Sequence, residues 1–275
     1  MQGKIYLVAT PIGNLEDITF RAINILKNVD LIAAEDTRHT LKLLNYYEIS
    51  KPLISYHRHN EEVKSSILIE KVLNGENIAI VTDAGTPGIS DPGEEIVKEA
   101  IENNIEIIPV PGACAFVNAL ISSGLNTKQF SFYGFLPLNK KLRKKIFEKI
   151  LKENKTVILY EAPHKLQKTL KDILENIGDV NCVIAKELTK MHEQFFRDKI
   201  TNLIPEFEEP KGEYIILLDL NEIQNEEENN IENKSIDEQY LFYQEQGMDK
   251  KEIIKIIAKN KKVPKNEIYQ HFIEK

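Results

Sequence analysis

The 275-residue sequence has no tryptophan and only two cysteines, Cys114 and Cys182. Two cysteines cannot build a disulfide framework or a cysteine-rich zinc site. No apolar run reaches the roughly 18 residues that span a bilayer, and the N-terminal stretch MQGKIYL lacks the layout of a secretory signal. We therefore expect a protein of the reducing cytoplasm, with no membrane partner.

Signatures of several common enzyme classes are missing as well. The first expected strand, residues 3–8, is not followed by G-x-G-x-x-G, and the chain contains no G-x-x-x-x-G-K-[ST] and no G-x-S-x-G. These absences argue against a Rossmann dehydrogenase, a P-loop NTPase and a serine hydrolase. His57 and His59 have a spacing that could hold a metal ion, but no third ligand stands near them, so we expect no metal.

Negative charge is concentrated in one short stretch. The chain has a net charge of −7, and residues 221–233 contain five glutamates without a lysine or an arginine. Such a composition predicts a disordered acidic linker, which we place at residues 222–234. The remainder is close to neutral, and a nearly neutral body can still bind nucleic acid through local basic clusters.

The pattern of apolar residues predicts the fold class. Short apolar strands alternate with segments of helical spacing, which indicates βαβ units and a mainly parallel sheet. A further strand at residues 193–197 would make part of the second half antiparallel. The Pro-Gly turn at residues 109–112 suggests a boundary. We expect an N-terminal α/β domain at residues 1–110, a C-terminal α/β domain at 111–221 and a helical tail module at 235–275.

Residues 78–93, IAIVTDAGTPGISDPG, are the stretch around which the chain is organised. A buried strand is expected to run into a loop with three glycines, two prolines and two aspartates. We expect the next helix to begin with Asp91 as its N-cap and Pro92 at its first position. Ligands of open α/β sheets bind beyond the carboxyl ends of strands, so this loop predicts a binding site. The alternative is an ordinary tight connection.

Polar clusters follow six of the expected strands, and together they predict a cleft. They occupy residues 11–14, 35–38, 57–60, 83–91, 161–164 and 187–190. Six clusters at corresponding strand ends suggest one site between two α/β halves.

Basic residues gather in two places. One expected helix carries Lys140, Lys141, Arg143 and Lys144, and the tail is also rich in lysine. The helix is either an ordinary solvated face or a contact for a phosphate backbone. The tail has a helix–turn–helix spacing that is compatible with nucleic acid or with protein partners.

Four motifs carry a resemblance to a known family. They are YLVATPIGNL at residues 6–15, EDTR at 35–38, DAGTPGISDPG at 83–93 and YEAPH at 160–164. The sequence resembles the tetrapyrrole methylase superfamily, and within it the bacterial enzymes that methylate 16S ribosomal RNA. The resemblance covers about residues 3–220. It implies two α/β domains with S-adenosylmethionine in the cleft between them, a homodimer, and transfer of a methyl group to the ribose 2′-oxygen of a cytidine in the decoding region of the small ribosomal subunit.

The resemblance also implies which residues contact the methyl donor. These are Pro11, Asp83, Ala84, Gly85, Thr86, Pro87, Ile89, Ser90, Pro111, Gly112, Ala113, Leu136, Pro137, Tyr160, Ala185, Glu187 and Gly212.

For catalysis we predict that Asp36, His57 or His59 accepts the ribose proton or holds the sugar, because all three follow strands of the first half. Arg38 and Lys190, together with the basic helix, are predicted contacts to RNA phosphates. Two other hypotheses for the function remain open. One is a tetrapyrrole C-methyltransferase, which the basic helix and tail disfavour. The other is a non-catalytic ribosome-assembly factor, which the intact loop at residues 83–93 disfavours.

Overall fold

The computed structural model describes residues 2–221, 234–245 and 247–272. The first unit of the fold contains one five-stranded sheet with the order β3-β2-β4-β1-β5, in which every neighbouring pair is parallel. Its strands are β1 (Lys4–Val8), β2 (Leu31–Ala34), β3 (Leu53–Ser55), β4 (Ile78–Val81) and β5 (Glu106–Val110). The central strands β2 and β4 are apolar and buried at every position, as expected of strands covered on both faces.

Helices cover both faces of this sheet. Helices α3 (Glu61–Leu73) and α4 (Glu94–Glu102) pack on one face, and α1 (Phe20–Asn28) and α2 (Thr37–Tyr46) pack on the other. Thr19 is the N-cap of α1, since its side chain accepts a hydrogen bond from the Ala22 amide. The predicted start of α4 is wrong. The helix begins at Glu94 with Gly93 as its N-cap, so Asp91 and Pro92 stay in the loop.

The second unit is built on a mixed sheet with the order β6-β7-β10-β8-β9. Its strands are β6 (Phe130–Phe135), β7 (Thr156–Glu161), β8 (Asn181–Lys186), β9 (Gln194–Lys199) and β10 (Tyr214–Asp219). In this sheet only β6 and β7 pair in parallel, so the prediction of a mainly parallel sheet is correct for the first unit alone. The antiparallel strand expected at residues 193–197 is confirmed as β9.

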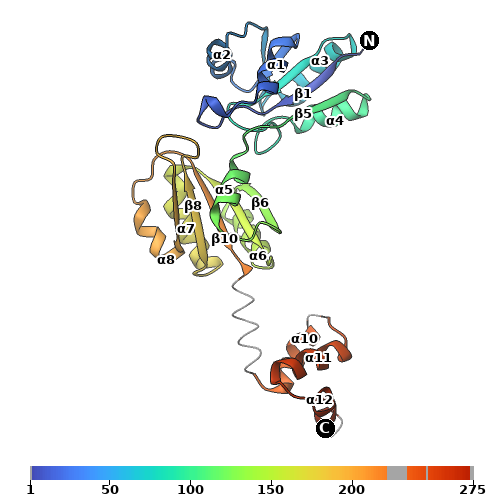
Figure 1. Cartoon of the computed structure of the whole chain (residues 1–275), viewed down its shortest axis with the longest axis vertical. Coiled ribbons are helices and arrows are strands. Elements are labelled where there is room, and N and C mark those ends of the chain that lie inside the picture. Colours follow the sequence, from blue (N-terminus) through green and yellow to red (C-terminus); the bar gives the residue numbers. More distant parts are fainter. Residues whose placement is uncertain (1, 222–233, 246, 273–275) are drawn as a thin grey trace.

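Helix α5 (Ala115–Ser123) packs on one face of the second sheet, while α6 (Lys140–Ile150) and α7 (Pro163–Asn176) cover the other with α8 (Ile200–Leu203). Two short 3-10 segments, η1 (Leu15–Asp17) and η2 (Ile204–Phe207), complete the two units. Figure 1 shows the first unit in blue to green above the second in green to orange, with α5 near their junction. The side chain of Ile12, from the first unit, belongs to the apolar core beneath α5.

The tail forms three helices, α10 (Ile236–Glu245), α11 (Lys250–Lys261) and α12 (Lys265–His271). They share a small apolar core centred on Tyr243, Ile257 and Ile268. This confirms the expected helical character of the tail. Most of the acidic linker, residues 222–233, lies outside the described residues. Within the described ranges, none of the helices has the length and hydropathy of a membrane span.

Candidate active site

Two loops at the carboxyl edge of the first sheet are joined by backbone hydrogen bonds. Thr10, after β1, donates its amide to the Gly85 carbonyl at 2.8 Å and accepts the Gly85 amide at 3.1 Å. The Thr10 hydroxyl donates to the Thr82 carbonyl at 3.1 Å. Gly85 has φ +90°, a conformation that favours glycine. These contacts hold the loop after β4 against the loop after β1.

A third loop, after β5, packs against both. The Thr86 hydroxyl donates to the Ala113 carbonyl at 3.0 Å. A Cβ atom at Gly112 would lie 2.8 Å from the Cβ of Ala9, so this close approach requires glycine. The chain leaves the first sheet here and enters α5. The three loops therefore form one wall at the junction between the two units.

The second unit meets this wall through β6. Within that unit, the amide of Phe116 on α5 donates to the Tyr160 hydroxyl on β7 at 3.1 Å. Gly134 lies at an irregularity in the pairing of β6 with β7 and has φ +61°. A Cβ atom there would lie 2.9 Å from the hydroxyl oxygen of Ser90, so β6 and the loop after β4 are in close contact. Within the first unit, the guanidinium of Arg58, after β3, donates to the Ser90 carbonyl.

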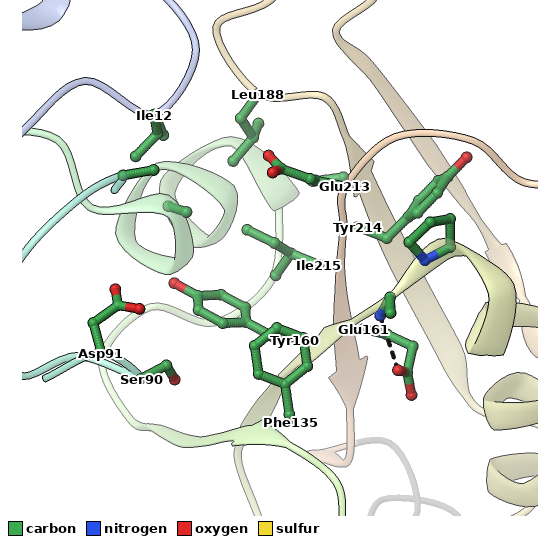
Figure 2. Close-up of a pocket in the computed structure, with 15 residues that line it drawn as sticks. Ile12, Ser90, Asp91, Phe135, Tyr160, Glu161, Leu188, Glu213, Tyr214 and Ile215 are labelled. Atoms are coloured by element: carbon green, nitrogen blue, oxygen red, sulfur yellow. Dashed lines mark hydrogen bonds between the residues drawn. The ribbon is translucent and has the colours of Figure 1, made fainter. Parts of the chain in front are cut away.

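A pocket of about 360 Å³ opens between the two units, and we name it the central pocket. Its lining combines four residues of the first unit with residues of β6, β7, β8, β10, their loops and the first positions of α5 and α7: Ile12, Ala84, Ser90, Asp91, Ala115, Phe135, Tyr160, Glu161, Ala162, Pro163, Ala185, Leu188, Glu213, Tyr214 and Ile215. Figure 2 shows the aromatic rings of Phe135 and Tyr160 at the floor and the carboxylate of Asp91 on the side of the first unit, turned toward the Tyr160 hydroxyl. The size and the mainly apolar lining are those of a small-molecule site.

Asp91 lies in an acidic environment. Burial is the main cause that raises the pKa of its carboxyl to about 7, and the nearby charges of Glu35 and Asp83 raise it further, while Arg58 opposes them. Burial also raises the pKa of Glu35, which follows β2. Asp83 accepts the Asp36 amide at 3.0 Å. The ends of β2 and β4 thus place three carboxyl groups beside the pocket wall.

The three predicted catalytic residues lie at the same edge of the sheet, but none of them lines the central pocket. Asp36 caps α2 and forms an ion pair of 2.7 Å with Arg38, whose hydrogen bonds hold the pKa of the Asp36 carboxyl far below its usual range. The His57 ring nitrogen Nε2 lies 3.2 Å from the Asn60 side-chain amide. His59 and Arg38 are exposed. These side chains therefore lie outside the lining of the pocket.

The predicted donor contacts fall into two groups. Ala84, Ser90, Tyr160 and Ala185 line the central pocket. The others are not among its lining residues, although most are sequence neighbours of residues that are: Pro11, Asp83, Gly85, Thr86, Pro87, Ile89, Pro111, Gly112, Ala113, Leu136, Pro137, Glu187 and Gly212. The predicted donor contacts do not include Asp91, Phe135 or the β10 residues at the pocket. Asp91 lies within the predicted cluster at residues 83–91, but its position before Pro92 favours the role of a helix cap.

Glu187 and Lys190 form a small network at the rim. Lys190 Nζ lies 2.9 Å from carboxylate oxygens of both Glu187 and Glu213. Glu187 also accepts the Glu213 amide at 2.9 Å. A Cβ atom at Gly212 would lie 2.7 Å from the Glu187 carboxyl group, so the loop before β10 depends on this glycine. Lys190, predicted to bind phosphate, already has two carboxylate partners.

The basic helix α6 presents three of its four predicted RNA contacts to solvent. Lys140, Lys141 and Lys144 are exposed. Arg143 is different, because its guanidinium forms a 2.9 Å ion pair with Asp172 and donates to the Thr169 hydroxyl at 2.8 Å. Its side chain is only 13% exposed, so it joins α6 to α7. Among the described residues, no group of histidine, cysteine and acidic side chains could hold a metal ion.

Comparisons with known proteins give a consistent result. The family model described as Tetrapyrrole (Corrin/Porphyrin) Methylases matches residues 4–204. The Bacillus subtilis protein named Ribosomal RNA small subunit methyltransferase I is 47% identical over 274 residues, which cover 98% of this chain and 94% of that protein. A Synechocystis protein of the same name is 44% identical and is matched over 98% of its length, with 99% of this chain covered. A crystal structure of diphthine synthase superposes with a TM-score of 0.63 at 15% identity, covering 78% of this chain and 90% of that one. At such low identity the structural likeness bears on the fold alone.

Proposed function

The chain belongs to the tetrapyrrole methylase family, and from that premise we propose that it transfers a methyl group from S-adenosylmethionine to ribosomal RNA of the small subunit. The proposed acceptor is the ribose 2′-oxygen of a cytidine in the decoding region of 16S RNA. The name shared by the Bacillus and Synechocystis relatives supports the RNA substrate. The single structural observation that supports the chemistry is the central pocket, which two α/β units build together.

The residues of the central pocket fit the proposed donor. An adenine ring suits the apolar and aromatic surface of Phe135, Ile215 and Leu188. A cationic sulfonium suits a pocket with the carboxylate of Asp91 on its wall. When bound, S-adenosylmethionine supplies an electrophilic methyl group. Methyl transfer needs no metal, because the reaction is an in-line displacement in which positioning contributes much of the rate.

The chain itself contributes orientation and exclusion of water. The loops after β1, β4 and β5 are fixed to one another by the Thr10–Gly85 and Thr86–Ala113 hydrogen bonds. Such a preorganised wall loses little conformational entropy when a ligand binds. We propose that the predicted donor residues outside the lining act through these loops, by holding the lining residues in place.

Residues outside the pocket lining are proposed to bind the RNA. Asp36, His57 and His59 are proposed to hold the target sugar, since they lie at the same sheet edge as Asp91. Arg38, with a side chain that is 88% exposed, is a proposed phosphate contact together with Lys140, Lys141 and Lys144. Lys190 is proposed to act mainly through its pairs with Glu187 and Glu213. The domain division at residues 110 and 221, the homodimer and a cytoplasmic location are part of the same proposal.

The experiment measures methyl incorporation from labelled S-adenosylmethionine into small ribosomal subunits that lack 2′-O-methyl groups, followed by mass spectrometry of the nucleosides. The proposal predicts 2′-O-methylcytidine at one site. Donor binding is measured separately by calorimetry. Tight donor binding without incorporation into subunits or naked RNA would contradict the RNA substrate and favour a tetrapyrrole acceptor. An absence of donor binding would favour a non-catalytic RNA-binding factor.

A further inference from the structure

We propose that helices α6 and α7 form a groove that binds the phosphate backbone of a single-stranded segment of the RNA substrate. The inference rests on the proposed function and deepens it, because it assigns the RNA a binding surface on the second unit. It also adds two residues of α7, Lys165 and Lys168, which are not among the RNA contacts predicted from the sequence.

A groove of about 410 Å³ lies between α6 and α7, and we name it the basic groove. On each helix its lining residues recur at steps of three and four positions, which places them on one helix face. Two helix faces therefore meet across the groove. The lining consists of residues of the second unit, none of which lines the central pocket: Leu138, Lys140, Arg143, Lys144, Phe147, Lys165, Lys168, Thr169, Asp172, Glu175 and Asn176.

The charge of the basic groove is opposite to that of the whole chain. Five cations and two acids line it, which leaves an excess of three positive charges on a chain with a net charge of −7. Among the residues that the structure describes, Lys140 and Lys144 from α6 and Lys165 and Lys168 from α7 form no ion pair, whereas Lys98 on α4 is paired with two carboxylates. Like charges on the two faces of a groove repel one another, so a polyanion between them is bound favourably.

One internal network fixes the spacing of the two helices. Arg143 Nε lies 2.9 Å from Asp172 Oδ2, and the Arg143 guanidinium donates to the Thr169 hydroxyl at 2.8 Å. The Thr169 hydroxyl donates to Glu161 at 2.5 Å. The network compensates the charge of Asp172, so Glu175 is the one exposed acid of the lining. The groove is therefore preformed, and an anion can bind to it with little rearrangement.

The basic groove and the central pocket meet at the start of α7. Pro163, the first residue of α7, lines the central pocket, and Lys165, two positions later, lines the basic groove. Glu161 lines the central pocket and accepts the hydroxyl of Thr169, which lines the groove. Two residues advance along a helix by about 3 Å. An RNA strand whose target ribose enters the central pocket can thus place the phosphates of neighbouring nucleotides in the groove.

The dimensions of the basic groove favour a single strand. A volume of about 410 Å³ is that of a site for a small molecule and is too small to enclose a double helix. Proteins bind single-stranded nucleic acid in positively charged grooves that follow the backbone. Leu138, which is 78% exposed in the lining, adds an apolar surface that can contact a base or a sugar.

The test measures binding of the full-length protein to naked 16S RNA and to small ribosomal subunits at several salt concentrations. Combining Lys165→Ala with Lys168→Ala should weaken binding roughly tenfold and reduce the slope of log K against log salt by about 1.4, since each phosphate contact to a single strand contributes about 0.7. The matched control combines Lys145→Ala with Lys149→Ala. It removes two exposed lysines of α6 outside the groove and should leave the slope unchanged.

A second pair of variants should act in the opposite direction. Glu175→Gln removes the exposed acid of the lining, so it should strengthen RNA binding, a result that partial unfolding cannot produce. Glu148→Gln, an exposed position of α6 outside the groove, is its control and should leave the affinity unchanged. Calorimetry with S-adenosylmethionine should give the wild-type donor affinity for all of these variants, because none of the substituted residues lines the central pocket.

The outcomes separate this inference from the proposed function. Equal losses of slope in the groove variant and in its lysine control would show that any surface lysine contributes, and would overturn the groove. An unchanged slope in the groove variant, with methylation of subunits by the wild type, would overturn the groove and leave the proposed function in place. If the wild type binds RNA but does not methylate it, the proposed function fails, and the comparison of the variants still decides the groove. A wild type that neither binds nor methylates RNA would contradict both.

Discussion

Glu61 at the start of α3 and Gly93 at the start of α4 are joined by a hydrogen bond of 2.7 Å from the Gly93 amide to Glu61 Oε1. The same oxygen lies 3.4 Å from the Glu95 amide and 3.2 Å from the Tyr56 hydroxyl. Glu61 therefore serves as the N-terminal cap of a helix to which it does not belong. A carboxylate at this place also interacts favourably with the positive, N-terminal end of the α4 dipole.

We expect Glu61→Ala to destabilise the protein by about 2 kcal/mol, because it leaves backbone amides without a charged acceptor. The measurement is unfolding by urea, followed by circular dichroism. Glu62→Ala is the matched control, since Glu62 is the exposed neighbour on the same helix and should change stability by less than about 0.5 kcal/mol. Equal effects of the two substitutions would show that the cap contributes nothing.

The Glu61 cap also explains why the sequence predicted the wrong start for α4. Asp91 followed by Pro92 is a favourable local signal for a helix N-terminus. The decisive acceptor comes instead from a residue 32 positions earlier in the chain, and a reading of local sequence contains no information on such a partner. The release of Asp91 from capping is what leaves its carboxylate available to the pocket.

Other parts of the fold followed more directly from the sequence. The alternation of short apolar runs with helical spacing predicted the strands of the first sheet, since β2 and β4 are buried throughout. The arrangement of the second sheet did not follow, because a buried apolar run has the same composition in parallel and antiparallel pairs. Strand β10 pairs with both β7 and β8 in antiparallel orientation, and this pairing is set by packing between distant segments.

The same limit applies to the candidate site. Motifs located the loops that build the central pocket, including Ser90 and Tyr160. They did not separate lining residues from those that support the loops, because this distinction depends on where side chains point. Arg143 illustrates the difficulty. It stands among four lysines in sequence, yet the turn of α6 directs it toward Asp172 and away from solvent.

Replacing Asp91 with Asn should stabilise the protein at neutral pH. The folded-state pKa of about 7 lies above the ordinary value, so the folded state favours the protonated form of Asp91. The stability that this preference contributes is complete below about pH 4 and is lost as the pH rises to 7. The shift corresponds to an upper bound of about 4 kcal/mol, and because the carboxyl is partly open to solvent we expect about 1–2 kcal/mol. Asn carries no charge and avoids this loss.

Urea unfolding at pH 5 and pH 8 measures the effect. The difference in the free energy of unfolding between Asp91→Asn and wild type should be larger at pH 8. A difference that does not change with pH would mean that Asp91 titrates normally. Greater stability combined with lost activity is the expected compromise at a functional site.

The exposed lysines of α6 should contribute to RNA affinity through counterion release. Replacing Lys140, Lys141 and Lys144 together with alanine should reduce the slope of log K against log salt by about two. Filter binding to 16S RNA at several salt concentrations gives the slope. The control is Lys27→Ala, which removes an exposed lysine of α1 and tests whether the loss of any positive charge reduces the slope.

Arg143→Met should instead lower the stability of the protein and leave the slope unchanged, since the Arg143 guanidinium is paired with Asp172.

Gly212→Ala should disrupt the rim of the pocket. The substitution places a Cβ atom 2.7 Å from the Glu187 carboxyl group and imposes a φ of +100° on a residue with a side chain. Gly178 provides a matched control, because it has φ +114° but no neighbouring atom within 4 Å of an added Cβ. Both variants carry the backbone strain, which costs about 1–2 kcal/mol. Only Gly212→Ala must also displace Glu187 from Lys190 and the Glu213 amide.

We therefore expect Gly212→Ala to be less stable than Gly178→Ala and to bind S-adenosylmethionine at least tenfold more weakly by calorimetry. Equal donor affinity in the two variants would show that Glu187 does not need its present position for the pocket to function.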